Sequence, residues 1–302
     1  MKKIIDLGLE LLSHQHFDSL AVGVVDFKNK TFERFEVSAT NILSPKPYLF
    51  FDLASLTKPL TNSAVLLKEP KYFSEQEHLL LNHRAGLPSG GLLSKKTWRE
   101  EILSYEIKPS ETLYSDYSSL RCMLEIEKKS QKKLKDLCSY YFDKNLLHWM
   151  DLPVESISPE YGVRNKKIVS GEVHDNNCFN LKEFVSHAGL FATIDGLCQS
   201  LLNLNQVTGM NEQLKEAFKS HGNNVRFIKG FDHVSDPEQS LAGKGSSIRT
   251  FGHLGFVGTS FWINLDQEKG AVILTNGVQS YWYEKSGLNH LRKTIGEAIW
   301  KM

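Results

Sequence analysis

The chain has 302 residues, of which 41% are apolar and 24% are charged, a composition typical of a globular protein and unlike that of a disordered one. Its 36 Lys and Arg residues balance 35 Asp and Glu residues, and the net charge of +1 gives no reason to expect a nucleic acid as partner. No apolar run reaches the ~18 residues of a membrane-spanning helix, so we expect no membrane segment.

The first residues favour a helix over a targeting signal. Two lysines precede an apolar pair at positions 4 and 5, as in a signal peptide, but Asp6 and Glu10 interrupt the apolar stretch and no small-residue cleavage site follows. Ile4, Leu7 and Leu11 recur at helical spacing. These features predict an amphipathic first helix and a cytoplasmic protein, with export by another route left open.

Strands and then a long helical region follow in the sequence. Residues 20–27 are apolar and rich in valine, and with residues 31–37 they predict a hairpin. The short aromatic and apolar run at 48–53 predicts a buried strand or extended segment. Strand signals then largely vanish up to about residue 204, and apolar periodicity predicts helices at 59–68, 74–82, 97–105, 118–128, 132–142 and 194–204.

Strand signals return near the C-terminus. Residues 225–231, 257–265 and 271–275 predict strands, and the polar segment 266–270 suits a hairpin loop between the last two. Residues 283–300 predict a closing amphipathic helix.

These patterns predict one domain over residues 1–302, of the α/β (α+β) class. A mostly antiparallel sheet flanked by helices would come from residues 1–54 and 206–302. Residues 55–205 would form an inserted, mainly helical subdomain.

Four cysteines, at positions 122, 138, 178 and 198, are too far apart for a zinc knuckle or a redox Cys-x-x-Cys pair. Their spacing therefore predicts free, mostly buried thiols. Two disulfides also fit their number, but nothing else in the sequence favours an oxidising compartment.

The first segment that carries chemistry is FDLASLTKPL at positions 51–60, in which Ser55 and Lys58 are three residues apart. A helix that starts at Ser55 would place both side chains on one face, and Pro59 is tolerated only in its first turn. A serine hydroxyl needs a neighbouring base to become a nucleophile, and a partly desolvated neutral lysine can supply one. The helix N-terminus adds backbone donors where negative charge would develop. Alone, the pattern also fits a capping serine beside a solvated lysine.

The second segment is Tyr114-Ser115-Asp116, in a short polar stretch before a predicted helix. A tyrosine held near a lysine can act as a phenolate-type base and later as an acid toward the leaving group. Asp116 can orient the lysine or accept a hydrogen bond from a substrate. Alone, the segment also fits a buried tyrosine beside a helix cap.

The third segment is TFGHLGFVGTS at positions 250–260, in which three glycines surround His253 just before a predicted strand. Glycine in a strand often marks the close approach of a backbone or ligand, so an exposed edge here could bind an acyl substrate by strand addition. The backbone N–H of Phe256 could then join that of Ser55 as an oxyanion hole. A glycine-rich bend with a structural histidine is the alternative.

Together, and in this order, the three segments resemble the signature of the serine β-lactamase and penicillin-binding protein superfamily, which is Ser-x-x-Lys, then Ser-x-Asn or Tyr-x-Asn, then Lys-Thr-Gly. The chain looks closest to the class C-like branch, which includes esterases and D-amino-acid peptidases. A histidine often replaces the last lysine in that branch, as in His253-Leu254-Gly255. Residues 79–88 resemble the family's loop after its second helix, and residues 171–177 and 187–191 resemble a subgroup similar to cell-wall-type hydrolases.

The resemblance implies a β-lactamase or DD-peptidase fold and roles for the matching residues. Ser55 would form the acyl-enzyme, with Lys58 and Tyr114 sharing the proton transfers. Asp116 stands where many relatives carry Asn. Its charge would tend to keep Lys58 protonated and leave more of the base role to Tyr114.

At the substrate edge, His253, Gly255 and Phe256 would contact the acyl group, and His253 would bind a carboxylate when protonated. A second set of polar residues is expected to be structural, with a zinc site among them as a weak alternative. This set is His83, His174, Asp175 and His187.

The sequence thus predicts a serine hydrolase that needs no metal or cofactor and cleaves a small-molecule or short-peptide substrate, an amide or an ester. The subgroup resemblance favours a D-amino-acid peptide or cell-wall fragment, as for a carboxypeptidase. The alternatives are a carboxylesterase and a catalytically silent relative that binds or senses muropeptides. No oligomeric state is predicted.

Overall fold

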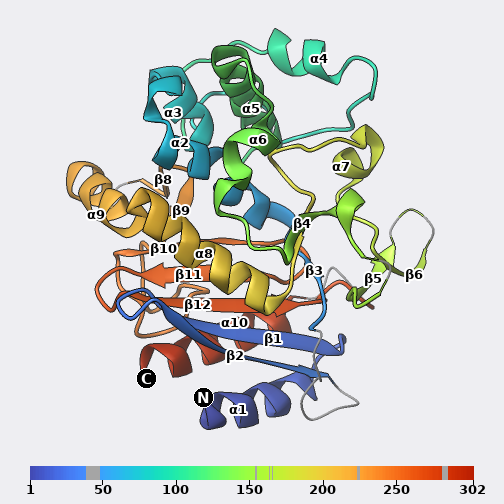
Figure 1. Cartoon of the computed structure of the whole chain (residues 1–302), viewed down its shortest axis with the longest axis vertical. Coiled ribbons are helices and arrows are strands. Elements are labelled where there is room, and N and C mark those ends of the chain that lie inside the picture. Colours follow the sequence, from blue (N-terminus) through green and yellow to red (C-terminus); the bar gives the residue numbers. More distant parts are fainter. Residues whose placement is uncertain (39–47, 154, 163, 165, 223–224, 281–284) are drawn as a thin grey trace.

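Strands from both ends of the chain form one antiparallel sheet in the computed structural model (Figure 1), which describes residues 1–38, 48–153, 155–162, 164, 166–222, 225–280 and 285–302. The seven strands lie in the order β2-β1-β12-β11-β10-β9-β8. Their bounds are β1 Ser19–Asp26, β2 Thr31–Ser38, β8 Phe227–Ile228, β9 Phe231–His233, β10 Thr250–Leu254, β11 Ser260–Asn264 and β12 Lys269–Thr275.

The valine-rich strand β1 lies between two hydrophobic cores. Only its last residue is not fully buried, as expected for a strand that is covered on both faces. Helices α1 (Lys2–Leu12) and α10 (Ser286–Trp300) cover one face of the sheet, and α8 (Ile194–Thr208) covers the other (Figure 1). Gly23 permits this packing, because a Cβ atom there would come within 2.3 Å of the Cys198 sulfur on α8.

Further helices and two small sheets lie between β2 and β8 in the sequence. One small sheet has the order β3-β7-β4 and the other pairs β5 with β6. The helices are α2 Ala64–Lys68, α3 Glu75–Leu81, α4 Trp98–Ser104, α5 Asp116–Ser130, α6 Leu134–Cys138, α7 Asn176–Leu181 and α9 Met210–His221. The strands are β3 Phe51–Asp52, β4 Leu146–His148, β5 Pro159–Gly162, β6 Lys167–Ser170 and β7 Leu190–Ala192.

The strongest local patterns predicted their elements correctly. The first helix, the β1–β2 hairpin, the β11–β12 hairpin, α5 and α8 lie where the sequence predicted them. All four cysteines are free and buried, as predicted. The predicted start of the last helix at Tyr283 lies outside the described residues, and α10 begins at Ser286.

Other elements differ from the prediction because distant partners form them. Segment 48–53 contains only the two-residue strand β3, which pairs with β7 and not with the central sheet. Segment 225–231 was predicted as one strand but is divided into β8 and β9 by a turn at Lys229 and Gly230, both with positive φ. The sequence predicted neither β10 nor α9, and none of the short strands β4 to β7.

None of the helices that the structure describes is both long enough and apolar enough to span a lipid bilayer.

Candidate active site

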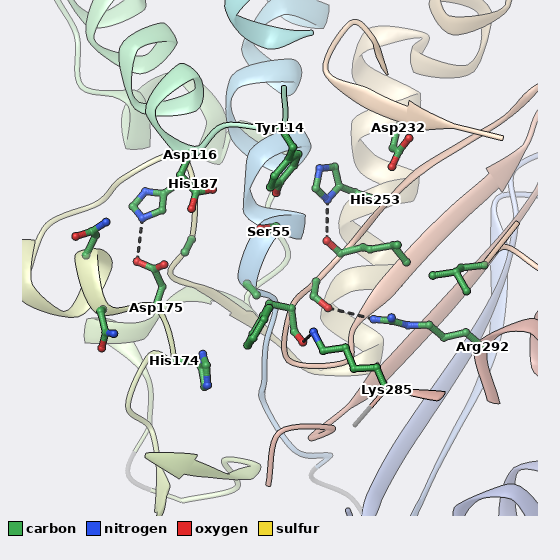
Figure 2. Close-up of a pocket in the computed structure, with 18 of the residues that line it drawn as sticks. Ser55, Tyr114, Asp116, His174, Asp175, His187, Asp232, His253, Lys285 and Arg292 are labelled. Carbon is green, nitrogen blue, oxygen red and sulfur yellow. Dashed lines mark hydrogen bonds and ion pairs between the residues drawn. The ribbon is translucent and has the colours of Figure 1, made fainter. Parts of the chain in front are cut away.

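A cavity of about 800 Å³ brings the three predicted segments together. Its walls include the turn at Ser55, the loop at 114–116, residues 174–177 at the start of α7, and the end of β10 (Figure 2). Every site residue predicted from the sequence lines this cavity except Lys58, which is buried directly behind Ser55.

Ser55 follows a strained residue at the start of a helical run. Ala54 has a φ of +45°, in the left-handed region that is unfavourable for a residue with a Cβ. The Asp52 carboxylate stabilises this turn, because it accepts hydrogen bonds from the Ala54 N–H at 2.7 Å and the His174 N–H at 2.9 Å. From this turn the backbone is helical up to Lys68, so the predicted helical start near Ser55 is confirmed.

Lys58 lies one helical turn after Ser55, and its side chain is only 4% exposed. Its Nζ is 2.9 Å from Ser55 Oγ, 2.7 Å from the Asp116 carboxylate and 3.1 Å from the His187 carbonyl oxygen. These three acceptors match the three N–H donors of an ammonium group. Lys58 therefore joins the Ser55 turn to the start of α5 and to the loop before β7.

The charge state of Lys58 follows from its neighbours. Burial alone would lower the pKa of Lys58, but the carboxylate of Asp116 and the phenol of Tyr114 outweigh it and raise this pKa above its ordinary value. Lys58 is therefore a cation at neutral pH, in agreement with the role expected for Asp116. In the resting site it donates a hydrogen bond to Ser55 and does not accept the hydroxyl proton.

Tyr114 lies beside Lys58 and faces the end of β10. Its ring centroid is 5.0 Å from Lys58 Nζ and 5.9 Å from the centroid of the His253 ring. The His83 ring packs against Tyr114 at 4.7 Å, and His83 Nδ1 accepts a hydrogen bond of 3.1 Å from the Ser115 N–H. His83 thus holds the Tyr114 loop in place, which is the structural role expected from the sequence.

His253 is buried on β10, where Gly252 on one side and Gly255 on the other leave no room for a side chain. Burial, together with the charge of Lys58, lowers the pKa of His253 to about 3. The ring is therefore neutral near pH 7. The expected binding of a carboxylate requires the protonated form of His253, and burial together with the charge of Lys58 disfavours that form near pH 7.

A tight turn after β10 carries Gly255 and Phe256. A Cβ on Gly255 would lie 2.0 Å from the Thr259 hydroxyl and 2.8 Å from the Leu53 carbonyl, so only glycine fits here. The Gly258 N–H donates to the Gly255 oxygen at 3.2 Å and closes the turn. Because a trans peptide directs its C=O and N–H in opposite directions, the N–H of Phe256 faces away from this turn.

Two cations that the sequence analysis did not single out also line the cavity. Lys285 donates to the Phe256 oxygen at 3.2 Å, and Arg292 donates to the Gly255 oxygen at 3.1 Å (Figure 2). Their spacing of seven residues, on or next to the last predicted helix, places them on one helical face, but only the fold brings that face to β10. A third cation at the cavity, Arg226, is paired with Asp232 at 3.1 Å.

The remaining wall contains the polar residues expected to be structural. His187 Nε2 lies 2.9 Å from the Asp175 carboxylate, and this carboxylate also accepts a hydrogen bond from the Cys178 N–H at the start of α7. Burial would raise the pKa of Asp175, but the contact with His187 holds it below its usual range. Across the described ranges, no group of three or more His, Cys, Asp or Glu side chains is placed to hold a metal ion.

Comparison with known proteins gives structural matches only. No family model and no curated protein matches the sequence. A β-lactamase from Mycobacterium bovis is similar with a TM-score of 0.61 and 16% identity over 97% of both chains. A D-amino acid amidase from Ochrobactrum anthropi SV3 has a TM-score of 0.66 and 11% identity over 96% of this chain and 97% of its own. Simvastatin synthase (LovD) from Aspergillus terreus also has a TM-score of 0.66 and 11% identity, over 99% of this chain and 97% of its own.

These matches extend over nearly the whole chain. At 11% to 16% identity they establish the architecture. The chain has the fold of the serine β-lactamase and penicillin-binding protein superfamily.

Proposed function

We propose that the protein is a serine hydrolase that cleaves a small amide or ester through an acyl-enzyme, without a metal. The observation that carries this proposal is the 2.9 Å contact between Lys58 Nζ and Ser55 Oγ, at the wall of a cavity that also contains Tyr114. A hydroxyl, an amine and a phenol within one such site form the arrangement expected of an activated serine nucleophile.

The reaction would proceed in two halves. Ser55 Oγ bonds to the acyl carbon while Tyr114, in its phenolate form, takes the hydroxyl proton. The N–H groups of Ser55 and Phe256 stabilise the oxyanion of the tetrahedral intermediate. Its collapse breaks the bond to the amine or alcohol, which receives the proton from Tyr114. Water then attacks the acyl carbon and gives its proton to Tyr114. Tyr114 passes this proton to Ser55 Oγ as the bond between Oγ and the acyl carbon breaks, which releases the acid and restores Ser55.

Lys58 supports this reaction as a cation. Its ion pair with Asp116 keeps it charged, so it can orient the Ser55 hydroxyl and stabilise the negative charge that develops between Ser55 and Tyr114 during the proton transfer. The Asp116 carboxylate thereby moves the base role from Lys58 toward Tyr114.

Replacing Asp116 by Asn should move the acid limb of the kcat/KM profile to lower pH by ~1–3 units. The change removes the carboxylate 2.7 Å from Lys58 Nζ that raises the pKa of Lys58. Without it the pKa of Lys58 falls, so the neutral form of Lys58, which can take the Ser55 proton, is populated at lower pH. Rates measured over the pH range in which both proteins stay folded check this. An acid limb at the same pH in both would exclude a role of Asp116 in tuning the base.

Within this reaction class, we favour a D-amino-acid peptide or related cell-wall fragment with a free carboxylate. Lys285 supports this choice: it is partly buried, lines the cavity, and forms no ion pair within the described part of the chain. Its ammonium is placed to bind an anionic group next to the Phe256 turn. One structural neighbour is a D-amino acid amidase, which is consistent with a small amide as substrate.

Replacing Lys285 by Met should raise KM for a peptide with a free C-terminal carboxylate by about tenfold and leave KM for p-nitrophenyl acetate unchanged. Burial and the charge of Arg292 lower the pKa of Lys285 to about 8. The ammonium is therefore lost as pH rises through about 8, and KM of the wild type for the peptide should rise there. Steady-state kinetics on both substrates test this. If KM for the peptide rises by the same factor above pH 8 in the Lys285→Met variant, the titrating group is not Lys285.

A carboxylesterase is the second candidate, favoured by two exposed apolar side chains at the cavity. Leu92 is 85% exposed and Phe256 is 40% exposed. The backbone around Leu92 is fixed, because Asn177 bonds to the Leu93 N–H at 2.9 Å and to the Gly91 oxygen at 2.7 Å. A fixed apolar side chain at the mouth suits an apolar acyl or alkyl group.

A substrate panel distinguishes these candidates. Purified protein would be incubated with a fluorescent penicillin, with peptides that end in D-Ala-D-Ala, and with p-nitrophenyl esters of increasing chain length. Release of D-Ala supports the peptidase, and turnover of esters alone supports the carboxylesterase. If every acylating reagent fails on folded protein, a binding or sensing role replaces the enzymatic one.

A further inference from the structure

A buried arginine lies behind the turn that carries Gly255 and Phe256. Arg292, on α10, is 4% exposed. Its Nη2 donates to the Gly255 oxygen at 3.1 Å and to the Thr259 oxygen at 2.8 Å. Figure 2 shows the guanidinium on the side of the turn away from Ser55.

The positive charge of Arg292 is not compensated within the described residues. Its guanidinium makes no ion pair with a described carboxylate, and its Nε is buried without a hydrogen-bond partner. Burial lowers the pKa of Arg292 to about 10, so the group is still charged at neutral pH. The nearby Lys285 is a second cation. A lone buried charge of this kind destabilises a fold.

The two carbonyl groups that Arg292 contacts do not depend on it. The Gly255 oxygen also accepts from the Gly258 N–H at 3.2 Å, and the Thr259 oxygen also accepts from the Gly255 N–H at 2.7 Å. Both oxygens would therefore keep a partner without the arginine. The need to satisfy buried backbone groups does not explain why a charged side chain is placed here.

The peptide between Gly255 and Phe256 connects Arg292 to the cavity. Its C=O accepts from the guanidinium, and its N–H is the oxyanion donor of the proposed reaction. The peptide is planar and trans, so these two groups point in opposite directions, with a cation at one end and the developing anion at the other. A hydrogen bond to the C=O polarises the peptide and strengthens the N–H as a donor.

We propose that Arg292 is a positioning residue that polarises the Gly255–Phe256 peptide and so stabilises the oxyanion formed on a substrate. This inference rests on the proposed acyl-enzyme function. It assigns Arg292 a role through the backbone, with no contact to the substrate. The burial of the Arg292 charge then costs folding stability but stabilises the transition state of the reaction.

The test is to replace Arg292 by Met and by Lys. For each variant, three quantities are measured: the acylation rate with p-nitrophenyl acetate, the affinity for a boronic acid that forms a tetrahedral adduct, and the midpoint of thermal unfolding. Arg292→Met should lower the acylation rate about tenfold to hundredfold, less than the ~10²–10³ lost with a direct oxyanion donor, with KM changed little. Affinity for the boronic acid should fall in parallel. The midpoint should not fall, because an uncompensated charge is removed. Arg292→Lys should restore part of the rate.

Arg121 provides the matched control. It also donates to backbone carbonyl groups, those of Ile102, Leu103 and Tyr105, but it has a carboxylate partner in Glu125 at 2.7 Å and lies outside the cavity. Arg121→Met should lower the thermal midpoint and leave acylation of the folded protein unchanged.

Two results would overturn the inference, and they differ. If Arg292→Met acylates at the wild-type rate, or if its rate falls only in proportion to the folded fraction, Arg292 has a structural role alone. The proposed function is then unaffected. A wild type that no ester or boronic acid modifies overturns the proposed function and the role of Arg292 with it.

Discussion

Replacing Ser55 by Ala should lower kcat/KM for p-nitrophenyl acetate by ~10⁴-fold or more, the scale on which loss of the nucleophile acts in serine hydrolases. The hydroxyl is the atom that bonds to the acyl carbon, and no other group replaces it. The fold should be unaffected, because the Ala54 turn is held by Asp52 and the Leu53 N–H bonds to the Leu190 oxygen at 2.9 Å, both independently of the hydroxyl.

A matched control for this change is Ser104→Ala. Ser104 lies at the end of α4 and is exposed, and its hydroxyl donates to the Glu101 oxygen at 2.7 Å within its own helix. This variant should retain the wild-type rate. Activity that survives in Ser55→Ala at more than a small fraction would require another nucleophile and would contradict the account.

Replacing Lys58 by Met should lower the acylation rate by ~10²–10³-fold, the range lost with a group that stabilises charge in an active site. Met fills a similar volume but removes the donor to Ser55 Oγ and the cation beside Tyr114 and Asp116. Asp116 is 32% exposed, so water can solvate its carboxylate once the cation is gone, and the variant should fold. Stopped-flow measurement of the first turnover separates this loss from any change in deacylation.

Lys135→Met is the control for the loss of a lysine–carboxylate pair. Lys135 lies 2.8 Å from Asp151, and both side chains are about half exposed, outside the cavity. Exposed pairs of this kind contribute little, so neither activity nor stability should change measurably. An Lys58→Met variant that acylates as fast as Lys135→Met would exclude Lys58 from the chemistry.

The catalytic candidates could be predicted because local chemistry constrains them. Ser55 and Lys58 share one helical turn whose start Pro59 restricts, and that relation needs no knowledge of the rest of the fold. Tyr114 directly precedes the serine that caps α5, and the Ser115 hydroxyl accepts from the Ser118 N–H at 2.9 Å. That these three residues meet at one cavity could be expected only from the family resemblance, and the structure places them together.

Other parts of the site depend on contacts that periodicity does not encode. Segment 250–254 forms a strand because β9 and β11 pair with it, although its Gly252 disfavours strands. Arg292 reaches the cavity only because α10 packs on the central sheet behind β10. The positive φ of Ala54 could not be predicted, because the Asp52 carboxylate that holds the turn is itself fixed by the distant His174 N–H.

The charge of His253 is a second property that could not be predicted from the sequence. Its place in the motif was predicted, but its protonation depends on burial and on the distance to Lys58 across the cavity wall. Sequence spacing gives neither quantity. The same holds for Lys285, whose pKa is lowered by burial and by the charge of Arg292.

The most direct test of the central claim is to identify the residue that forms the covalent bond. The folded protein would be treated with a fluorophosphonate and analysed by intact mass and then by peptide mapping. The account predicts one adduct per chain, on the peptide that contains Ser55, and no adduct in Ser55→Ala. An adduct on a different residue, or labelling that persists in Ser55→Ala, would contradict it.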